Sequence, residues 1–244
     1  YWCGYPDFDH SAPDWDDVLA VGFTGMAERL RKNWKDTDYY PPRQTAVDAV
    51  FRLIDRLIAQ GERKVGKNGE DGQRIFRQVE SLKRLRAGPP VTTLDALNLI
   101  YLYWVMSENF EGIQVRTLGN LDRLLTPFYR ADLAAGRTTE AEFRNQLKHF
   151  WWQWGSIANY WGQPVYFGGT KADGTTEYNP LSSVILDVMD ECALPTPKLH
   201  VKIGKSTPDW VWNRTTDMAR RMRPISFLGE EPHARVIRSM GYTA

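Results

Sequence analysis

The sequence predicts a helix-rich α/β fold in which strands and helices alternate through the last third of the chain. Three observations support this. Residues 165–205 read as strand, glycine bend, helix and strand; residues 208–240 continue the alternation; and the region before residue 157 is dominated by apolar residues at helical spacing. Alternation of this kind implies parallel strands joined by helical crossovers, and a ligand pocket beside their glycine-rich ends.

Length and composition restrict the class of protein. The chain has 244 residues, of which 42% are hydrophobic and 25% charged, with a formal net charge of +1. This is a composition typical of globular domains, and its near-neutral charge balance gives no reason to expect nucleic acid or an anionic membrane as a partner. No apolar run approaches the length of a membrane span. Two cysteines and four scattered histidines form neither a disulfide framework nor a metal-ligand repeat, so no metal is expected.

The first half of the chain predicts helices separated by proline and glycine. Ser11, as a cap, and Pro13, in the first turn, predict the start of a helix that runs to about Trp34. The helices expected after it cover about 44–60, from about 73 to 85, and about 93–106, the last capped by Thr92 or Thr93 and apolar nearly all round, with an irregular stretch at 107–119.

The second half predicts both helices and strands. Leu121 and Thr139 open helices that end near residues 135 and 154. The later elements are a strand at 165–167, a turn at 171–175, a helix at about 179–191, a strand at 198–203, a helix at about 208–222, a strand at 224–228 and a helix at about 232–240.

Two side-chain clusters invite a functional interpretation. The aromatic run around Trp151, Trp152 and Trp154, followed by Trp161, could form a wall for a small ligand or a sugar, but packing in the core and between helices is the favoured interpretation. The acids Asp187, Asp190 and Glu191 could work as an acid/base pair, but their spacing is also that of the solvated face of an amphipathic helix.

Several phrases, in order along the chain, resemble the pyruvate formate-lyase family of glycyl radical enzymes. They are Asp9–Trp15, Leu121-Asp122 with Pro127-Phe128-Tyr129, Gly168-Gly169 with Asp173-Gly174 and Asn179, Pro197–Lys202, Pro224–Phe227 and Met240–Ala244. The resemblance implies that residues 1–244 are one partial domain, without a second domain, and form part of a ten-stranded α/β barrel.

The resemblance also implies radical chemistry. Family members carry a backbone glycyl radical, which a separate iron–sulfur activating enzyme installs with S-adenosylmethionine; the radical passes to a cysteine that abstracts hydrogen from the substrate. The phrases that would hold this cysteine and this glycine are expected beyond Ala244, and neither Cys3 nor Cys192 stands in a matching context. The chain is therefore expected to contribute pocket wall, to bind no cofactor itself, and to be inactive alone.

Three residues match pocket-facing positions of the family, and they are the predicted substrate-binding residues: His10, Gln114 and Val115. The expected function is a lyase or dehydratase acting on a small polar metabolite in an anaerobic cytoplasm. Its expected partners are the substrate, the activating enzyme and the remainder of the same enzyme, with a homodimer left open. The alternatives are a non-catalytic half-barrel that binds or assembles, and an aromatic-lined small-ligand or carbohydrate binder.

Overall fold

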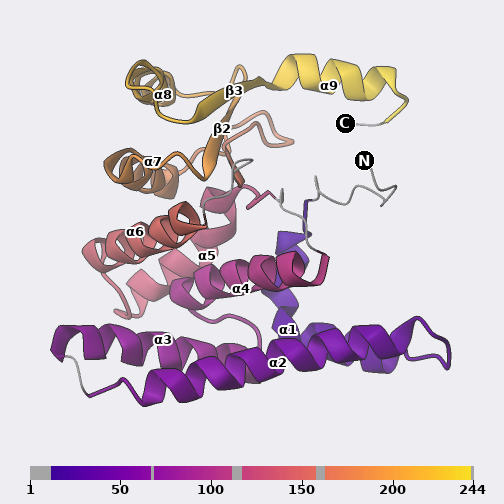
Figure 1. Cartoon of the computed structure of the whole chain (residues 1–244). Helices are drawn as coiled ribbons and strands as arrows, with labels where there is room; N and C mark the ends of the chain where they lie inside the picture. The colour runs from indigo at the N-terminus through magenta and orange to yellow at the C-terminus, as the bar shows by residue number, and fades with distance from the viewer. Residues whose placement is uncertain (1–11, 67–68, 112–116, 158–162, 243–244) are drawn as a thin grey trace, which may run out of the picture. The chain divides into compact units, whose positions relative to one another are not determined.

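The structure, a computed structural model, describes residues 12–66, 69–111, 117–157 and 163–242 (Figure 1). The chain divides into two compact units, one within Asp14–Ile113 and the other within Gln114–Ala244. The described part of the first unit is helical, whereas the second unit holds a parallel sheet with helices.

The first unit contains four helices that pack through apolar faces. Ile54 and Leu85, from the second and third helices, and Leu99 from the fourth are fully buried. The fourth helix is the most apolar and, as the sequence predicts, is buried on most of its surface. These helices are α1 (Trp15–Lys32), α2 (Tyr40–Glu62), α3 (Gly69–Ala87) and α4 (Thr93–Glu111).

Several boundaries in this unit differ from the prediction, among them the start of α3, which is Gly69 and not about residue 73. The cap of α1 is Asp14, whose side chain accepts a hydrogen bond from the Asp17 amide, so the predicted start around Pro13 is wrong and Ser11 lies outside the described residues. Helix α2 begins at Tyr40 and not near residue 44 as predicted, because Pro41 and Pro42 suit the first helical turn. Helix α4 continues to Glu111, into the stretch predicted to be irregular.

The second unit alternates helices and strands, in agreement with the prediction. Its three strands form one sheet in the order β1-β2-β3, and both neighbouring pairs are parallel. The elements are α5 (Leu121–Ala134), α6 (Glu140–Ser156), β1 (Pro164–Phe167), α7 (Pro180–Cys192), β2 (Lys198–Ile203), α8 (Asp209–Arg220), β3 (Ile225–Gly229) and α9 (Glu230–Ser239).

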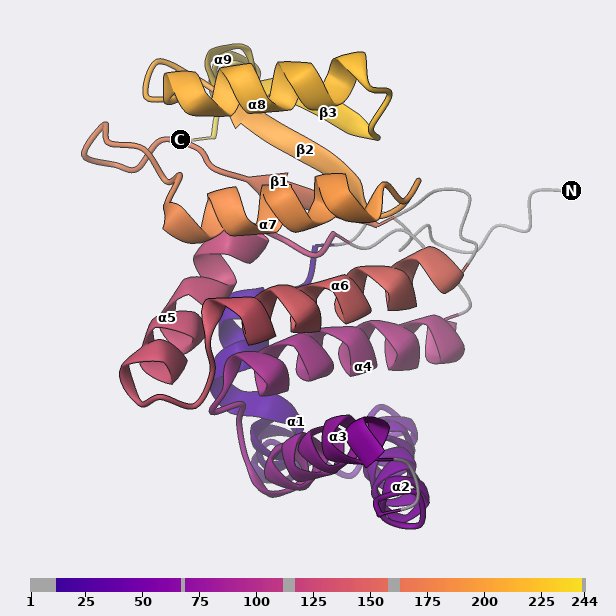
Figure 2. The same ribbon diagram turned by 90° about the vertical axis from the view of Figure 1, so that its left-hand side faces the viewer.

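One face of the sheet forms the core of this unit. Val165 and Phe167 of β1 are paired in register with Leu199 and Val201 of β2, and all four are buried. Helices α7 and α8 lie on this side of the sheet, and α9 leaves β3 toward the other side (Figures 1 and 2). Because side chains alternate along a strand, the residues between these four point to the opposite face.

Side-chain caps fix the helices that flank β1. The helix predicted to open at Thr139 is α6, and Thr139 forms a capping box with Glu142 at its start. Asn179 caps α7 by accepting from the amides of Leu181 and Ser182. The chain after β1 therefore enters α7 at a defined residue, and this fixes the loop between them.

Candidate functional site

The three predicted substrate-binding residues lie where the structure gives no description. His10, Gln114 and Val115 all fall outside the described residues. Their roles stay predictions, and a candidate site is built here from the described residues of the second unit.

The face of the sheet opposite α7 and α8 carries polar side chains. Tyr166 of β1, His200 of β2 and Ser226 of β3 stand in one row across the three strands. Lys202 lies two residues after His200 on the same face. We call Tyr166, His200, Ser226 and Lys202 the open-face cluster.

The three larger members of the open-face cluster lie close together. The Tyr166 and His200 ring centroids are 5.0 Å apart, and the Lys202 ammonium lies 6.0 Å from the centroid of the Tyr166 ring. His200 Nδ1 is buried and has no hydrogen-bond partner among the described residues. Buried polar atoms are normally hydrogen-bonded, so an unpartnered nitrogen on a polar face indicates a place for a ligand or a water molecule.

Burial changes the protonation of two of these groups. It lowers the pKa of His200 below the ordinary value of 6.5, with a further contribution from the positive charge of Lys198. It also lowers the pKa of Lys202, an effect that the charges of Glu230 and Asp122 oppose. The cluster therefore offers a neutral imidazole, which can both donate and accept a hydrogen bond, next to a half-buried ammonium.

The loop after β1 borders the open-face cluster. Gly168 and Gly169 both have positive φ angles, of 67° and 127°. A Cβ atom on Gly168 would lie 2.1 Å from the ring of Tyr178, whose hydroxyl donates to the carbonyl of Lys202. Residue 168 must therefore be glycine for two reasons: its φ angle is positive, and the Tyr178 ring leaves no room for a side chain. At the predicted Gly168-Gly169 bend, the backbone thus packs against an aromatic ring.

Glu230 joins the carboxyl ends of the strands. Its carboxylate accepts hydrogen bonds from the amide and the hydroxyl of Thr170, at 2.7 and 2.6 Å. It also occupies the space beside Gly204, the residue after β2, where a Cβ atom would lie 2.0 Å from Glu230 Oε2. One side chain at the start of α9 therefore ties the loop after β1 to the ends of β2 and β3.

A buried carboxyl group supports the same loop from α5. Asp122 is 1% exposed and accepts a 2.6 Å hydrogen bond from the Ser182 hydroxyl of α7. Burial raises the pKa of Asp122, although the bonds from Ser182 and from backbone amides, including that of Gly168, oppose this. Asn120 adds a 3.2 Å bond to the Gly168 carbonyl. These contacts position the loop and do not reach the open face.

The acids of α7 form ion pairs and are not an acid/base pair. Asp187 contacts Arg144 and Arg214, and Glu191 contacts Arg144 and Lys148. Asp190 is held by Arg221 and Arg223, which lower the pKa of its carboxyl group against the effect of burial. These pairs connect α7 with α6 and α8. The Asp187 and Asp190 side chains are only 25% and 15% exposed, so the interpretation as a solvated helix face holds for Glu191 and is wrong for the other two.

The aromatic run belongs mainly to the core. Trp151 and Trp154 are 1% and 2% exposed, whereas Trp152 is 50% exposed and Trp161 lies outside the described residues. The aromatic wall predicted for a sugar is therefore wrong for the described tryptophans, because successive residues of a helix face different directions. Helical spacing had favoured packing between helices, and the structure confirms this for Trp151 and Trp154.

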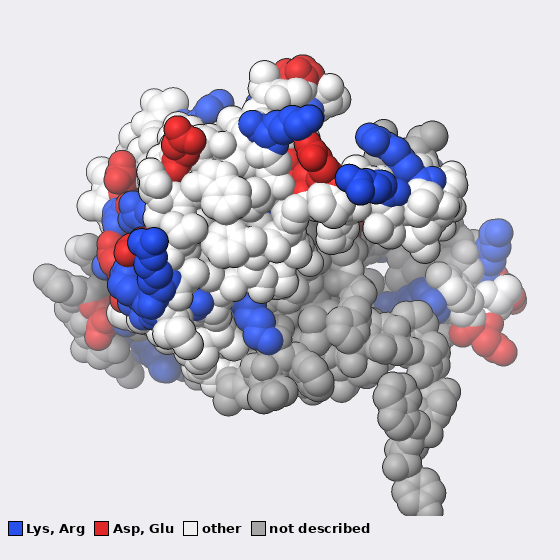
Figure 3. All heavy atoms as spheres, turned by 90° about the horizontal axis from the view of Figure 1, so that it is seen from above, with Lys and Arg blue, Asp and Glu red and all other residues white. Residues whose placement is uncertain are grey.

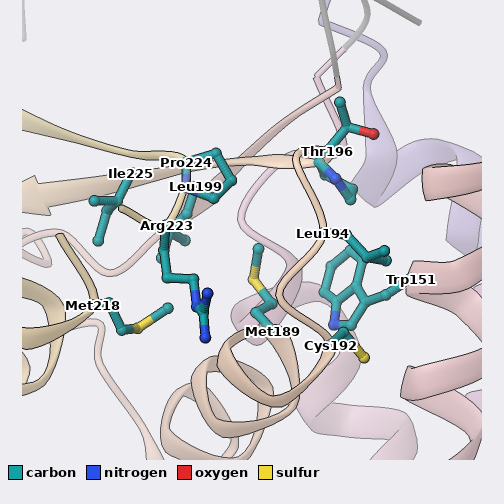
Figure 4. A pocket seen from close by; sticks show the side chains of 11 residues that line it. Trp151, Met189, Cys192, Leu194, Thr196, Leu199, Met218, Arg223, Pro224 and Ile225 are labelled. Carbon is teal, nitrogen blue, oxygen red and sulfur yellow. The ribbon is translucent and has the colours of Figure 1, made fainter. Parts of the chain in front are cut away.

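A small apolar cavity lies beside Trp151, away from the open-face cluster. It has a volume of about 20 Å³, and Figure 4 shows Met189, Met218, Leu199 and Ile225 around it. That volume is about enough for one water molecule. The cavity is too small for a metabolite, so it is not a competing substrate site.

The charged side chains on the surface are distributed as the near-neutral net charge of the chain leads us to expect. On the face seen in Figure 3, basic and acidic side chains of the described residues lie near one another, with uncharged surface between the groups. In the part of the chain that the structure describes, no helix is long and apolar enough to cross a membrane.

The members of the open-face cluster were not among the predicted site residues, although the strand that carries His200 and Lys202 was predicted. The signal was the alternation in residues 198–203, where lysine, histidine and lysine alternate with leucine, valine and isoleucine. That pattern places His200 and Lys202 on one face. Only the pairing register adds Tyr166 and Ser226, because no local pattern encodes which strands are neighbours.

The second unit has an α/β fold, in which one face of a parallel sheet packs under helices and the other carries polar side chains. The fold is that of glycyl radical enzymes. A glycyl radical enzyme from Archaeoglobus fulgidus superimposes with a TM-score of 0.85 at 19% identity, over 96% of this chain and 34% of that one. The glycerol-bound, B12-independent glycerol dehydratase of Clostridium butyricum gives 0.79 at 18% identity, over 98% and 34%.

Sequence comparison shows the family. A family model described as pyruvate formate lyase-like matches residues 6–244, and the chain belongs to this family. It is 29% identical to trans-4-hydroxy-L-proline dehydratase of Clostridioides difficile, over 84% of this chain and 30% of that one. It is 22% identical to isethionate sulfite-lyase of Bilophila wadsworthia, over 82% and 28%. The chain thus spans about 30% of the length of these relatives.

Proposed function

We propose that this chain is the central part of a glycyl radical lyase or dehydratase that acts on a small polar metabolite in an anaerobic cytoplasm. The observation that carries the proposal is the open-face cluster, whose polar groups point away from the helix-covered core. A family assignment that spans residues 6–244 and relatives that are dehydratases and lyases support it.

In the longer protein, a cysteine thiyl formed from a backbone glycyl radical would abstract a hydrogen atom from the substrate, and the proposal places both residues beyond Ala244. The described residues would bind and orient the substrate. The neutral imidazole of His200 and the hydroxyl of Tyr166 can hydrogen-bond substrate hydroxyl groups. His10, Gln114 and Val115 remain proposed contacts from other segments. Apolar packing behind β1 and β2 excludes water from one side of the sheet.

The proposal includes partners. The substrate is a small molecule, and a separate activating enzyme that uses S-adenosylmethionine and an iron–sulfur cluster would install the radical. The remainder of the same polypeptide would supply the cysteine, the glycine and the other strands of the barrel. A homodimer remains compatible with the proposal.

The test uses the full-length protein, incubated without oxygen with an activating enzyme of the family, S-adenosylmethionine and a reductant. We expect an electron paramagnetic resonance doublet from a glycyl radical, and loss of this signal when oxygen is admitted. A full-length protein that is folded but never yields the doublet would exclude the catalytic proposal. The alternative, a non-catalytic half-barrel that binds or assembles, would then be favoured.

A further inference from the structure

Lys202, a member of the open-face cluster, carries a charge that the described residues do little to compensate. Its side chain is half-buried, and its ammonium makes no hydrogen bond or ion pair with the residues that the structure describes. Removing an ammonium from water costs free energy unless another charge or hydrogen bond compensates. The ring of Tyr166, 6.0 Å from Nζ, offers only weak compensation at that distance.

Three acids influence Lys202, namely Glu230, Asp122 and Glu177, and the two with the larger effect are engaged elsewhere. Glu230 accepts both hydrogen bonds from Thr170 at the end of the sheet. Asp122 is buried beneath the loop and accepts from Ser182. None of the three, Glu177 included, forms an ion pair with Lys202, so the ammonium remains available to a negative group that arrives on the open face.

Two other groups would assist such a negative group. His200 presents a buried and unpartnered Nδ1 on the neighbouring position of the same strand face. Tyr166 is near both, with its ring centroid 5.0 Å from that of His200 and 6.0 Å from the Lys202 ammonium. An ammonium with adjacent hydrogen-bond donors suits an oxyanion better than a neutral diol, because charge-assisted hydrogen bonds are roughly twice as strong as neutral ones.

We propose that Lys202 binds the anionic group of the substrate, a carboxylate or a sulfonate, with His200 and Tyr166 as its hydrogen-bonding neighbours. The inference rests on the proposed function and names the substrate class for the same site. It predicts that the preferred metabolite is a small hydroxylated anion and not a neutral polyol.

The test is a binding measurement on the full-length protein before activation, so that it needs no radical. Two pairs of probes share a hydroxyalkyl part and differ in the group attached to it, which is anionic in one member and a neutral alcohol in the other: lactate against 1,2-propanediol, and isethionate against ethylene glycol. Calorimetric titration at constant ionic strength should show both anions bound, and Lys202→Met should weaken them by about tenfold or more. The two neutral probes should change by less than about twofold, because the ammonium contributes little to them.

Two variants separate a direct contact from a structural effect. Lys202→Arg keeps the charge and should retain most of the anion affinity. Lys205→Gln removes an exposed lysine three residues away, with a side chain 91% exposed, and should leave the affinity unchanged. Equal weakening of anions and neutral probes in Lys202→Met would show a structural role and overturn the inference, as would a wild-type protein that binds neither anion. A radical doublet in the same preparation would leave the proposed function standing in either case.

Discussion

At the scale of single residues, the open face of the sheet concentrates polar atoms that the fold leaves unused. His200 is the clearest case, because its ring is half-buried between Lys198 and Lys202 and its Nδ1 has no partner among the described residues. A protonated imidazole in that position would add a third positive charge to the face. This explains why both burial and Lys198 lower the pKa of His200.

This shift of the pKa makes stability depend on pH. The pKa of His200 is lower in the folded than in the unfolded chain, where it is about 6.5. As the pH falls below that value the unfolded state takes up the proton first, so the free energy of unfolding decreases. His200→Gln in the full-length protein should lose less stability than wild type between pH 7.5 and 5.5. Denaturant unfolding at both pH values measures this.

The exposed His233 provides the control for that experiment. His233→Gln should follow the wild-type pH dependence. A His200→Gln protein that loses as much stability as wild type would show that His200 titrates alike in both states, and would remove the argument for a neutral imidazole on the open face.

Asp122 shows how a buried carboxyl group positions the site without entering it. Asp122→Ala would leave the Ser182 hydroxyl and a backbone amide of the loop without a partner. Unpaired buried groups of this kind cost about 1–3 kcal/mol each. We expect the free energy of unfolding to decrease by at least that amount, and Asp122→Asn, which can still accept hydrogen bonds, to lose less. The exposed Asp36→Ala should be nearly neutral, and an equally neutral Asp122→Ala would contradict the role assigned to it.

At the scale of elements, the loop from β1 to α7 depends on a close contact between backbone and ring. Gly168 has a φ angle of 67°, and the Tyr178 ring fills the space of a side chain. Gly168→Ala should therefore cost the left-handed backbone penalty of about 1–2 kcal/mol and a further steric cost from the displaced ring.

Gly174 provides a matched control within the same loop. Its φ angle is 81°, but a Cβ atom there would meet no atom within 4 Å. Gly174→Ala should cost only the backbone penalty, so the difference between the two variants measures the contact with Tyr178. Thermal unfolding of both variants tests this, and equal losses would show that the ring moves aside freely.

Helix starts and strands were largely predictable where a short sequence pattern determines them. The helix starts near Thr139 and Asn179 and the alternating strand 198–203 follow from short patterns, and the structure confirms them. The start of α1 was predicted too early, because serine and aspartate both suit the cap position and the cap that the structure shows is Asp14. The site could not be predicted in the same way, since Tyr166, His200 and Ser226 meet only through strand pairing.

At the scale of the whole molecule, the fold and the family could be predicted from the sequence, whereas the reaction could not. Periodicity predicted a helix-rich α/β fold with parallel strands, and the sheet order confirms it. The family followed from phrases spread along the chain and is confirmed by a match to residues 6–244. The reaction stays a proposal, because the chain spans about 30% of the length of its relatives.

The unpaired edge of β3 in the described sheet affects how these residues are expected to behave in solution. Strand β3 pairs with β2 along one edge, and no described strand pairs with its other edge; Phe227, on this strand, is 42% exposed. Free backbone donors beside exposed aromatic surface offer a template on which further strands can add. A preparation of these 244 residues alone is therefore expected to self-associate as it is concentrated. Light scattering per unit concentration, measured over a range of concentrations, tests this, and scattering that stays constant would contradict it.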